Sequence, residues 1–360
     1  MKKSPPKTSV FGSSPISCNI PLDEEGCRHG ALELITSGIE YNYGVVPIPI
    51  TVMKNGEGPT VFLSSGCHGD EYEGQLVVRH LIHALKLKDI NGSLIILPAL
   101  NYPAVMAGAR TSPLDQGNLN RSFPGHPDAG PTGAIAHYIT NTLFPMCDAG
   151  IDLHTGGRDI DFLPVGFVCA TPDMKLFEAV MKMSGCFDTD YIAVCDCGTP
   201  PSGIDGAAHG LGMPFLSAEL GGGGASATKV IKTGISSVMN LLRHLGVLKG
   251  PKVQNAKEHV YLDFISGYEH VTATKDGLFR TFVDVGDPVE AGQLMALLYP
   301  LDDAAAAPVE VVSPIEGIVV LRRSINRVIK GNYIFTVARP ADGEEIRRIV
   351  SESVASQAIP

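Results

Sequence analysis

The residues best suited to chemistry begin where a short apolar segment, VFLSS, ends and the chain continues as GCHGDEYE. His68 and Glu71 stand three positions apart there, a compact arrangement for binding one divalent metal ion with an imidazole and a carboxylate. The pair alone is weak evidence, because the chain has 11 His and 38 acidic residues, and about one such pair is expected by chance. A surface His beside a solvated acid is the alternative interpretation.

Two further residues end predicted strands in the same way. His154 ends the segment AGIDLH, and Glu219 ends a strand within PFLSAEL, just before four glycines. Ligands bind at the carboxyl ends of the strands in an open α/β sheet, so these side chains are expected to meet. Two His and one Glu with a fourth position left open is the pattern of a catalytic zinc site, which predicts His68, Glu71 and His154 as ligands. Taken alone, His154 also fits a core histidine and Glu219 an edge acid.

Hydrolysis at such a site needs one more carboxylate, which does not bind the metal. A zinc ion lowers the pKa of a bound water toward neutrality. A free acid can then take the water's proton and pass it to the leaving group. Glu219 is the candidate for this acid.

Cationic residues come from a long polar segment, residues 101–133, which is rich in Gly and Pro. We expect a loop here, and a loop this long in a compact domain is usually functional. Of Arg110 and Arg121, one could stabilise the oxyanion that develops on the carbonyl under attack, and the other could bind a substrate carboxylate through parallel hydrogen bonds. Asn118 or Asn120 could add a polar contact. The alternative is a surface role, with both arginines paired to acids of the same loop.

The elements that would position these groups follow an α/β pattern. The strand at residues 61–65 leads through the HGDE loop to an amphipathic helix over 74–87. A continuous apolar run over 93–100 then suits a strand buried on both faces. Strand, loop, helix and strand form the βαβ signature of an α/β sheet. A long helix over 229–245 is expected to pack on this sheet and close a first domain, residues 1–250.

A second module, residues 251–345, contains two copies of one half-motif. In the alignment of the copies, Gly277 corresponds to Gly317 and Gly292 to Gly331. The period of two throughout predicts an all-β domain, and the pattern resembles the lipoyl/biotinyl-type barrel-sandwich. The connection between the halves, PLDDAAAAPVE, has no Lys to carry biotin or lipoate, which favours a structural or interfacial role.

Composition excludes several classes of protein. The chain of 360 residues is 44% hydrophobic and 18% charged, with a net charge of −10. It has no basic tract and no apolar run near the ~18 residues that span a bilayer, so neither nucleic acid nor a membrane is an expected partner. No secretory signal is recognised, and eight scattered Cys suit reduced thiols of a cytoplasmic protein. Residues 1–15 are expected to form a loosely ordered arm and 346–360 a C-terminal tail.

Four motifs together resemble the succinylglutamate desuccinylase/aspartoacylase family of the zinc carboxypeptidase-like superfamily. They are HGDE at 68–71, AGAR…NLNRSFPG at 107–125, DLHTGG at 152–157 and AEL at 218–220. The resemblance extends over roughly residues 43–248, and the β module matches the family's C-terminal domain in kind. The segments NLNRSFPG and PLDQG are most similar to the branch that contains N-acetyl-diaminobutyrate deacetylases of ectoine breakdown.

This resemblance implies a fold and a ligand set. The fold would be α/β, with a mixed central sheet flanked by helices, followed by the all-β barrel-sandwich-like domain. His68, Glu71 and His154 would hold one zinc ion per chain. HGDE and DLHTGG stand where aspartoacylases have HGNE and DLHNT, so the aspartate-specific site is not carried over, and no partner for a substrate side chain is assigned.

The resemblance also implies the remaining roles. Glu219 would be the general base and then the general acid, and Arg110 would polarise the scissile carbonyl. Asn120 and Arg121 would hold the substrate's α-carboxylate. The predicted activity is a zinc-dependent amidohydrolase that removes an N-acyl group from a small Nα-acyl amino acid, with N-acetyl-diaminobutyrate as the best single guess.

Two other functions remain open at this point, and so does a homo-oligomer. A metallocarboxypeptidase acting on short peptides would keep the zinc site but need a wider cleft than the β module is expected to leave. A non-catalytic carrier or binding protein would be built around the β module, and its missing Lys counts against that function.

Overall fold

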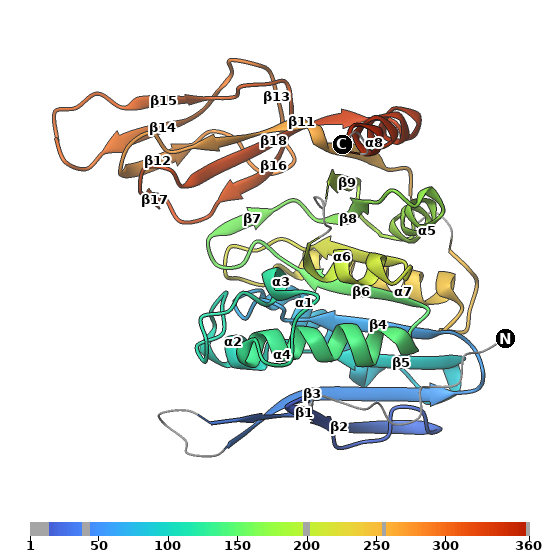
Figure 1. Cartoon of the computed structure of the whole chain (residues 1–360). Helices are drawn as coiled ribbons and strands as arrows, with labels where there is room; N and C mark the ends of the chain where they lie inside the picture. The colour runs from blue at the N-terminus through green and yellow to red at the C-terminus, as the bar shows by residue number, and fades with distance from the viewer. Residues whose placement is uncertain (1–13, 38–43, 197–201, 254–256, 358–360) are drawn as a thin grey trace.

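The structure of the chain is a computed structural model that describes residues 14–37, 44–196, 202–253 and 257–357 (Figure 1). Residues 1–13 of the expected N-terminal arm lie outside the described residues. The strands of the N-terminal part are β1 (Ile16–Cys18), β2 (Gly26–Thr36), β3 (Gly44–Asn55), β4 (Thr60–Ser65), β5 (Gly92–Leu97), β6 (Ala149–His154), β7 (Ile160–Phe162), β8 (Val165–Ala170), β9 (Tyr191–Asp196) and β10 (Phe215–Glu219).

The remaining elements complete the chain. The strands of the C-terminal part are β11 (Val260–Thr272), β12 (Gly277–Thr281), β13 (Pro288–Val289), β14 (Leu294–Pro300), β15 (Val309–Val312), β16 (Gly317–Arg323), β17 (Arg327–Val328) and β18 (Tyr333–Ala341). The helices are α1 (Tyr72–Ala84), α2 (Tyr102–Ala107), α3 (Leu119–Ser122), α4 (Gly130–Tyr138), α5 (Met174–Ser184), α6 (Gly203–Gly210), α7 (Thr228–Leu245) and α8 (Gly343–Gln357). Short 3-10 or π turns occupy Leu87–Asp89, Ile139–Leu143 and Phe144–Met146.

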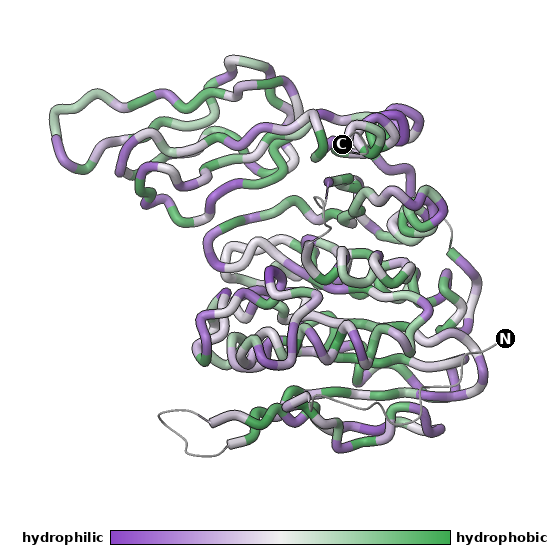
Figure 2. The backbone as a smooth tube through the Cα atoms, viewed as in Figure 1, coloured by the Kyte–Doolittle hydropathy of each residue, from purple (hydrophilic) through white to green (hydrophobic). Residues whose placement is uncertain are grey.

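One mixed sheet of 14 strands runs through the molecule, in the order β1-β2-β3-β5-β4-β6-β10-β8-β9-β11-β18-β16-β13, with β7 paired to β16. Strands β5, β4, β6 and β10 are parallel neighbours, and the hairpin β2-β3 joins them through an antiparallel pairing of β3 with β5. Most residues along the central strands are hydrophobic, as expected for strands that are covered on both faces (Figure 2). The prediction of a mixed α/β sheet is confirmed.

Two hydrophobic cores lie on the two faces of this sheet, and β4 contributes to both. Val61 and Leu63 pack on one face with residues of α1, α5, α7 and α8. Phe62 points to the other face and packs with residues of α4 and α6. The alternation follows from the period of two along a strand. Burial of both faces fixes the register of the central strands, and therefore the level at which each strand ends.

The helices largely match their prediction. Helix α7 covers residues 228–245, and Gly246 follows it in the left-handed conformation with φ +81°, so the expected C-cap is confirmed. The segment 101–133 differs from a plain loop because it contains α2, α3 and the start of α4. Such short helices hold the polar residues of this segment in fixed positions over the carboxyl ends of the strands.

The C-terminal module shows the repeat that its sequence predicts. Strands β12 and β14 pair within the first half, and β16 and β18 pair within the second. The short strand of each half crosses to the other: β13 pairs with β16, and β17 pairs with β12. This exchange joins the halves into one all-β unit, whose core includes Phe279, Val289, Val328 and Phe335.

Hydrogen bonding is continuous across the predicted boundary between residues 250 and 251. Strand β11 pairs in parallel with β9 of the first part, and β16 pairs with β7. The division into 1–250 and 251–345 therefore stays a proposal about folding units. Most of the predicted tail, residues 346–360, is helix α8, in which Ile346 and Val350 are fully buried in a core of the first part.

The structure bears on two expectations that were drawn from composition. In the described part of the chain, no helix is both long and apolar enough to cross a membrane. Cys169 is disulfide-bonded, so the expectation that the cysteines are reduced is wrong for this residue. Among the described residues, Cys18, Cys27, Cys67, Cys147 and Cys195 are free thiols.

Candidate metal centre and active site

The carboxyl ends of three neighbouring parallel strands bring the predicted site residues together. In the register of β6 and β10, His154 lies directly beside Glu219. Strand β4 lies on the other side of β6, with Ser65 beside Leu153, so the loop with His68 and Glu71 starts at the same level. Gly69 of this loop has no room for a side chain, because a Cβ there would lie 1.9 Å from the carbonyl oxygen of Ala104 in α2. The glycine of HGDE therefore lets α2 close over the loop.

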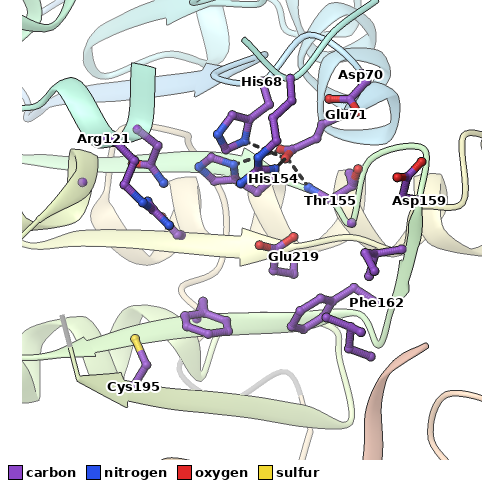
Figure 3. A pocket seen from close by; sticks show the side chains of 18 of the residues that line it. His68, Asp70, Glu71, Arg121, His154, Thr155, Asp159, Phe162, Cys195 and Glu219 are labelled. Atoms are coloured by element: carbon purple, nitrogen blue, oxygen red, sulfur yellow. Dashed lines mark hydrogen bonds and ion pairs between the residues drawn. The ribbon is translucent and has the colours of Figure 1, made fainter. Parts of the chain in front are cut away.

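His68, Glu71 and His154 form a compact buried cluster (Figure 3). The two carboxylate oxygens of Glu71 contact one imidazole each: Oε1 lies 2.6 Å from Nδ1 of His68, and Oε2 lies 2.9 Å from Nδ1 of His154. The backbone N–H of Thr155 donates to Oε2 at 3.2 Å, which fixes the carboxylate. One potential ligand atom from each of the three residues lies within 4.8 Å of the others. The predicted ligand set is thus brought together by the fold.

The donor set fits a zinc ion. Two imidazole nitrogens and a carboxylate are typical ligands of catalytic zinc, and they lie about 3.4 Å apart around a tetrahedral ion. The far nitrogen of each ring faces an acceptor: Nε2 of His68 donates to Oδ1 of Asn118 at 3.1 Å, and Nε2 of His154 lies 2.9 Å from Oδ2 of Asp152. The His154–Asp152 contact is close enough for an ion pair, although its angles do not meet those of a hydrogen bond. Such outer partners orient metal-binding histidines.

The electrostatics of the cluster also favour a cation. Burial alone would raise the pKa of Glu71, but His154 and His68 hold it well below its usual value. Burial alone would lower the pKa of His154, but the charges of Asp152 and Glu71 raise it well above its usual value. A proton on His154 is stabilised by the same two carboxylates that would stabilise a metal ion beside it.

A second group of potential ligands shares His154 but is a poorer candidate. Cys67, Asp152 and His154 also come within ligand distance of one another. Burial raises the pKa of the Cys67 thiol well above its usual value, so the thiolate that a metal requires is disfavoured. The hydroxyl of Ser64 donates to Asp152 at 2.7 Å, and neither Cys67 nor Asp152 lines the pocket. This group is closed to substrate.

Glu219 faces the cluster without belonging to it (Figure 3). Its Oε2 atom is buried and has no hydrogen-bond partner among the described residues. Burial and the nearby charge of Glu71 raise the pKa of Glu219 to about 8. A metal ion held by the cluster would favour the ionised form of Glu219 and so lower this pKa. An unpartnered carboxyl group with a shifted pKa, placed opposite a metal site, is suited to proton transfer.

Arg110 lies at the edge of the cluster. Its Nη1 donates to Oε1 of Glu71 at 3.4 Å, and about half of its side chain (53%) is exposed. Its charge also reaches Glu219, whose pKa it lowers in part. The surface alternative, a pairing with Asp115 or Asp128, is not what the structure shows, because Asp115 accepts from Thr132 and Asp128 lies beside His126.

Asn120 and Arg121 line the same pocket from helix α3. Oδ1 of Asn120 accepts a hydrogen bond from the backbone N–H of Ile204 in α6, which leaves its amide N–H groups as donors. The side chain of Arg121 reaches into the pocket and makes no ion pair or hydrogen bond with any residue that the structure describes (Figure 3). An exposed guanidinium facing a pocket is available to an anionic group of a ligand.

The pocket around these residues has a volume of about 810 Å³. One wall comes from the C-terminal module, because Leu321 and Arg323 of β16 are among its lining residues. Arg323 is held there by Asp159, which its guanidinium contacts at 3.2 Å. The β module thus forms part of the site, in agreement with the expected interfacial role.

The four glycines after Glu219 serve the fold more than the ligand. Gly222 has φ +141°, and a Cβ there would lie 2.2 Å from the carbonyl oxygen of Ile160 in β7. The N–H of Gly156 donates to the carbonyl oxygen of Gly221, so the glycine segment packs against the loop that follows His154. These glycines therefore allow backbone to pack closely on backbone beside the site.

Several residues of the site were missed from the sequence. Asp152 stands two residues before His154 and therefore on the same face of β6, a signal that the period of two along a strand provides. Asn118 was considered only as a general polar contact, although it accepts from His68. Asp205 and Ser217 in the pocket wall carried no motif at all.

Removing one outer partner is expected to weaken metal binding without abolishing it. Asp152→Asn should lower the zinc affinity by about 10- to 100-fold, because it loses the negative charge that orients and polarises His154. Competition with a chromophoric chelator measures this affinity. Asp148→Asn is the matched control at the opposite end of β6, where Asp148 accepts from the N–H of Thr60, and its zinc affinity should not change. Equal affinity in Asp152→Asn and the parent protein would contradict the orienting role.

The chain is similar to known proteins of one family. Residues 57–245 match the family described as the succinylglutamate desuccinylase/aspartoacylase catalytic domain. The chain is 38% identical over 325 residues to an N-alpha-acetyl-L-2,4-diaminobutyric acid deacetylase of Halomonas elongata, a match that covers 90% of this chain and 95% of that protein.

Solved structures of similar proteins match this chain over 91–92% of its length. A product-bound structure of the ectoine utilization protein EutE (DoeB) from Ruegeria pomeroyi has a TM-score of 0.86 and 38% identity, covering 91% of this chain and 99% of the other. A succinylglutamate desuccinylase from a Silicibacter species has a TM-score of 0.87 and 36% identity, covering 92% of this chain and 100% of the other. These structures share both the sheet and the C-terminal module with this chain.

Proposed function

Because the chain belongs to the succinylglutamate desuccinylase/aspartoacylase family, we propose that it is a zinc-dependent hydrolase that removes the acyl group from the α-nitrogen of a small amino acid. The observation that supports this best is the meeting of His68, Glu71 and His154 with an unpartnered Glu219 in one pocket. Three ligands and a free acid are the parts that hydrolysis with a metal-activated water requires.

His68, Glu71 and His154 would hold the ion. Bound zinc supplies a Lewis acid for the acyl carbonyl and an activated water. Glu219 takes a proton from the attacking water and delivers it to the leaving amine. The guanidinium of Arg110 stabilises the negative charge that develops on the carbonyl oxygen.

The far end of the substrate is bound by α3. Arg121 pairs with the α-carboxylate, and an amide N–H of Asn120 donates to the same group. The names of the relatives support an N-acyl amino acid as substrate, and the Halomonas protein in particular supports Nα-acetyl-2,4-diaminobutyrate. A cytoplasmic location and the oligomeric state stay predictions from the sequence.

The proposal is tested with the purified, zinc-loaded protein and a panel of amides. Nα-acetyl-2,4-diaminobutyrate, N-acetylaspartate, N-succinylglutamate and a series of dipeptides are supplied in turn, and release of free amine is measured. Hydrolysis of N-acyl amino acids but not dipeptides is expected. Turnover of dipeptides alone would establish the carboxypeptidase alternative, and no turnover of any amide at full zinc loading would overturn the proposal.

Loss of Arg121 is expected to act on substrate binding. Arg121→Ala should raise KM by about 10- to 100-fold, because a hydrogen-bonded charge contact contributes about 1.5–3 kcal/mol. Steady-state kinetics at saturating zinc measures KM and kcat separately. Arg121→Lys keeps the charge and should recover part of the effect, whereas Arg79→Ala, an exposed Arg on α1 away from the pocket, should leave KM unchanged. A normal KM in Arg121→Ala would remove this residue from the carboxylate site.

A further inference from the structure

The pocket holds a carboxylate that the proposed chemistry does not use. Asp205 lines it from α6, close to Ser217 and on the same side as Asn120 and Arg121. Among the described residues, the only side chain that donates to Asp205 is Ser217, whose hydroxyl lies 2.9 Å from each of the two carboxylate oxygens. Within the described residues, Asp205 pairs with no Lys, Arg or His. A pocket carboxylate without a counter-charge is a binding site for a cation.

The charge of Asp205 depends on its surroundings. Burial raises the pKa of Asp205 to about 6, whereas the hydrogen bond from Ser217 and the charge of His154 act in the opposite direction. A cation bound beside Asp205 would lower this pKa and favour the ionised form. The cost of keeping that charge in the pocket is met if a ligand supplies the opposite charge.

The position of Asp205 relative to the metal centre can be read from strand β10. Ser217 and Glu219 are two residues apart and therefore project from the same face, toward the pocket that both line. Two residues along a strand advance by about 6.6 Å, so the backbone at Ser217, whose hydroxyl contacts Asp205, lies about that far from the backbone at Glu219. In a 2,4-diamino acid, four bonds separate the two nitrogens, which can lie about 5 Å apart. The second amine of such a substrate can therefore extend from the metal centre toward Ser217.

The proposed carboxylate site is adjacent to this acid. Asn120 accepts from the N–H of Ile204, the residue before Asp205, so α3 and α6 meet at this point. A substrate whose α-carboxylate rests on Asn120 and Arg121 would place its Cα near the start of α6. Its side chain would then extend along the wall that contains Ser217 and Asp205.

We propose that Asp205 determines substrate specificity by binding a positively charged side-chain amine of the substrate, with Ser217 holding the carboxylate in place. The substrate class is accordingly an Nα-acyl diamino acid whose second amine lies about two methylene groups beyond Cα. This inference rests on the proposed function. It also predicts that N-acetylaspartate and N-succinylglutamate are poor substrates, because the charge of Asp205 would repel their acidic side chains.

The test uses two substrates that differ only in the amine. Nα-acetyl-2,4-diaminobutyrate has the cationic group, and Nα-acetyl-2-aminobutyrate has the same carbon chain without it. In the zinc-loaded protein, Asp205→Asn should lower kcat/KM for the cationic substrate by about 10- to 100-fold, mainly through KM. For the neutral substrate kcat/KM should stay within about threefold. Ser217→Ala should shift the ratio of the two kcat/KM values in the same direction by a smaller factor.

A matched control removes a carboxylate outside the pocket. Asp148, just before β6, accepts from the backbone N–H of Thr60 and does not line the pocket. Asp148→Asn should therefore leave the ratio of cationic to neutral kcat/KM at that of the parent protein. Calorimetric binding of free 2,4-diaminobutyrate and 2-aminobutyrate to the parent protein and to Asp205→Asn gives a second readout that does not depend on turnover. Asp205→Ala, which also removes the charge, replaces Asp205→Asn if the latter does not fold. Asp205→Glu, which keeps the charge, should retain part of the preference for the cationic substrate.

The outcomes separate the two proposals. Suppose that the parent protein hydrolyses N-acyl amino acids, and that Asp205→Asn lowers kcat/KM equally for both substrates or for neither. The cation site is then refuted while the hydrolase proposal stands. If the parent protein hydrolyses neither substrate and binds neither amino acid, both proposals fall. The assignment of Asp205 is supported if Asp205→Asn lowers kcat/KM only for Nα-acetyl-2,4-diaminobutyrate and weakens binding only of free 2,4-diaminobutyrate.

Discussion

Glu219→Gln is expected to lower kcat by about two to four orders of magnitude while leaving zinc bound. The substitution keeps the size of the side chain and removes the group that can accept and return a proton. Glu219 is not a member of the ligand cluster, and its Oε2 atom has no partner among the described residues, so the amide should fit without disturbing the metal ligands.

The measurement combines turnover with metal content. Steady-state kinetics on an N-acyl amino acid gives kcat, and atomic spectroscopy of the dialysed protein gives zinc per chain. Arg79→Ala is again the control for expression and handling. Near-normal turnover in Glu219→Gln would show that another group moves the proton. Loss of zinc would instead place Glu219 among the ligands.

Glu71→Gln is expected to remove the metal itself and, with it, all metal-dependent turnover. Glu71 is the central member of the cluster, because its two oxygens contact His68 and His154 and it is the only acid of the three. Zinc binding requires a deprotonated carboxylate at this position. A neutral amide carries no negative charge to stabilise the ion. The loss of zinc affinity should exceed the 10- to 100-fold typical of outer partners.

Glu73, two residues after Glu71, provides a matched control. Glu73 is also buried, but it bonds to Thr155 and to the backbone N–H of Gly222 and is not part of the ligand cluster. Burial raises the pKa of Glu73 to about 7, so a neutral Gln resembles a form that the protein already populates. Glu73→Gln should retain zinc, as measured by chelator competition. If Glu71→Gln kept one zinc per chain and Glu73→Gln lost it, the ligand assignment would be wrong.

The place of the β module decides how its role can be tested. Cutting the chain near residue 248 would remove β11 from the edge of β9 and take α8, with Ile346 and Val350, out of the core. Such a truncation would expose an edge strand and destabilise the remaining protein, so a change in substrate range would have two explanations. Substitutions at Leu321 and Arg323, which line the pocket from β16, address the module's contribution directly.

Much of the fold was accessible from the sequence because local patterns specify it. Short, mainly apolar segments predicted the buried strands β4, β5, β6 and β10, and the helical period predicted α1 and α7. The paired glycines of the C-terminal half predicted an internal repeat, which the pairings of β12 with β14 and β16 with β18 confirm. What no local pattern contained was the pairing of β11 with β9, which fuses the two parts into one sheet.

The sequence by itself determined which residues can bind a metal, since an HxxE motif and a His and a Glu at strand ends depend only on residue type and spacing. Only the tertiary structure decided that they meet, because their approach depends on the parallel order β4-β6-β10 and on the register that sets Glu219 beside His154. The same holds for Asp205, Ser217 and Arg323, which have no motif and reach the pocket through long-range packing alone. Residues near in sequence are specified by local propensity, whereas residues that come together from distant segments are specified by how buried faces fit.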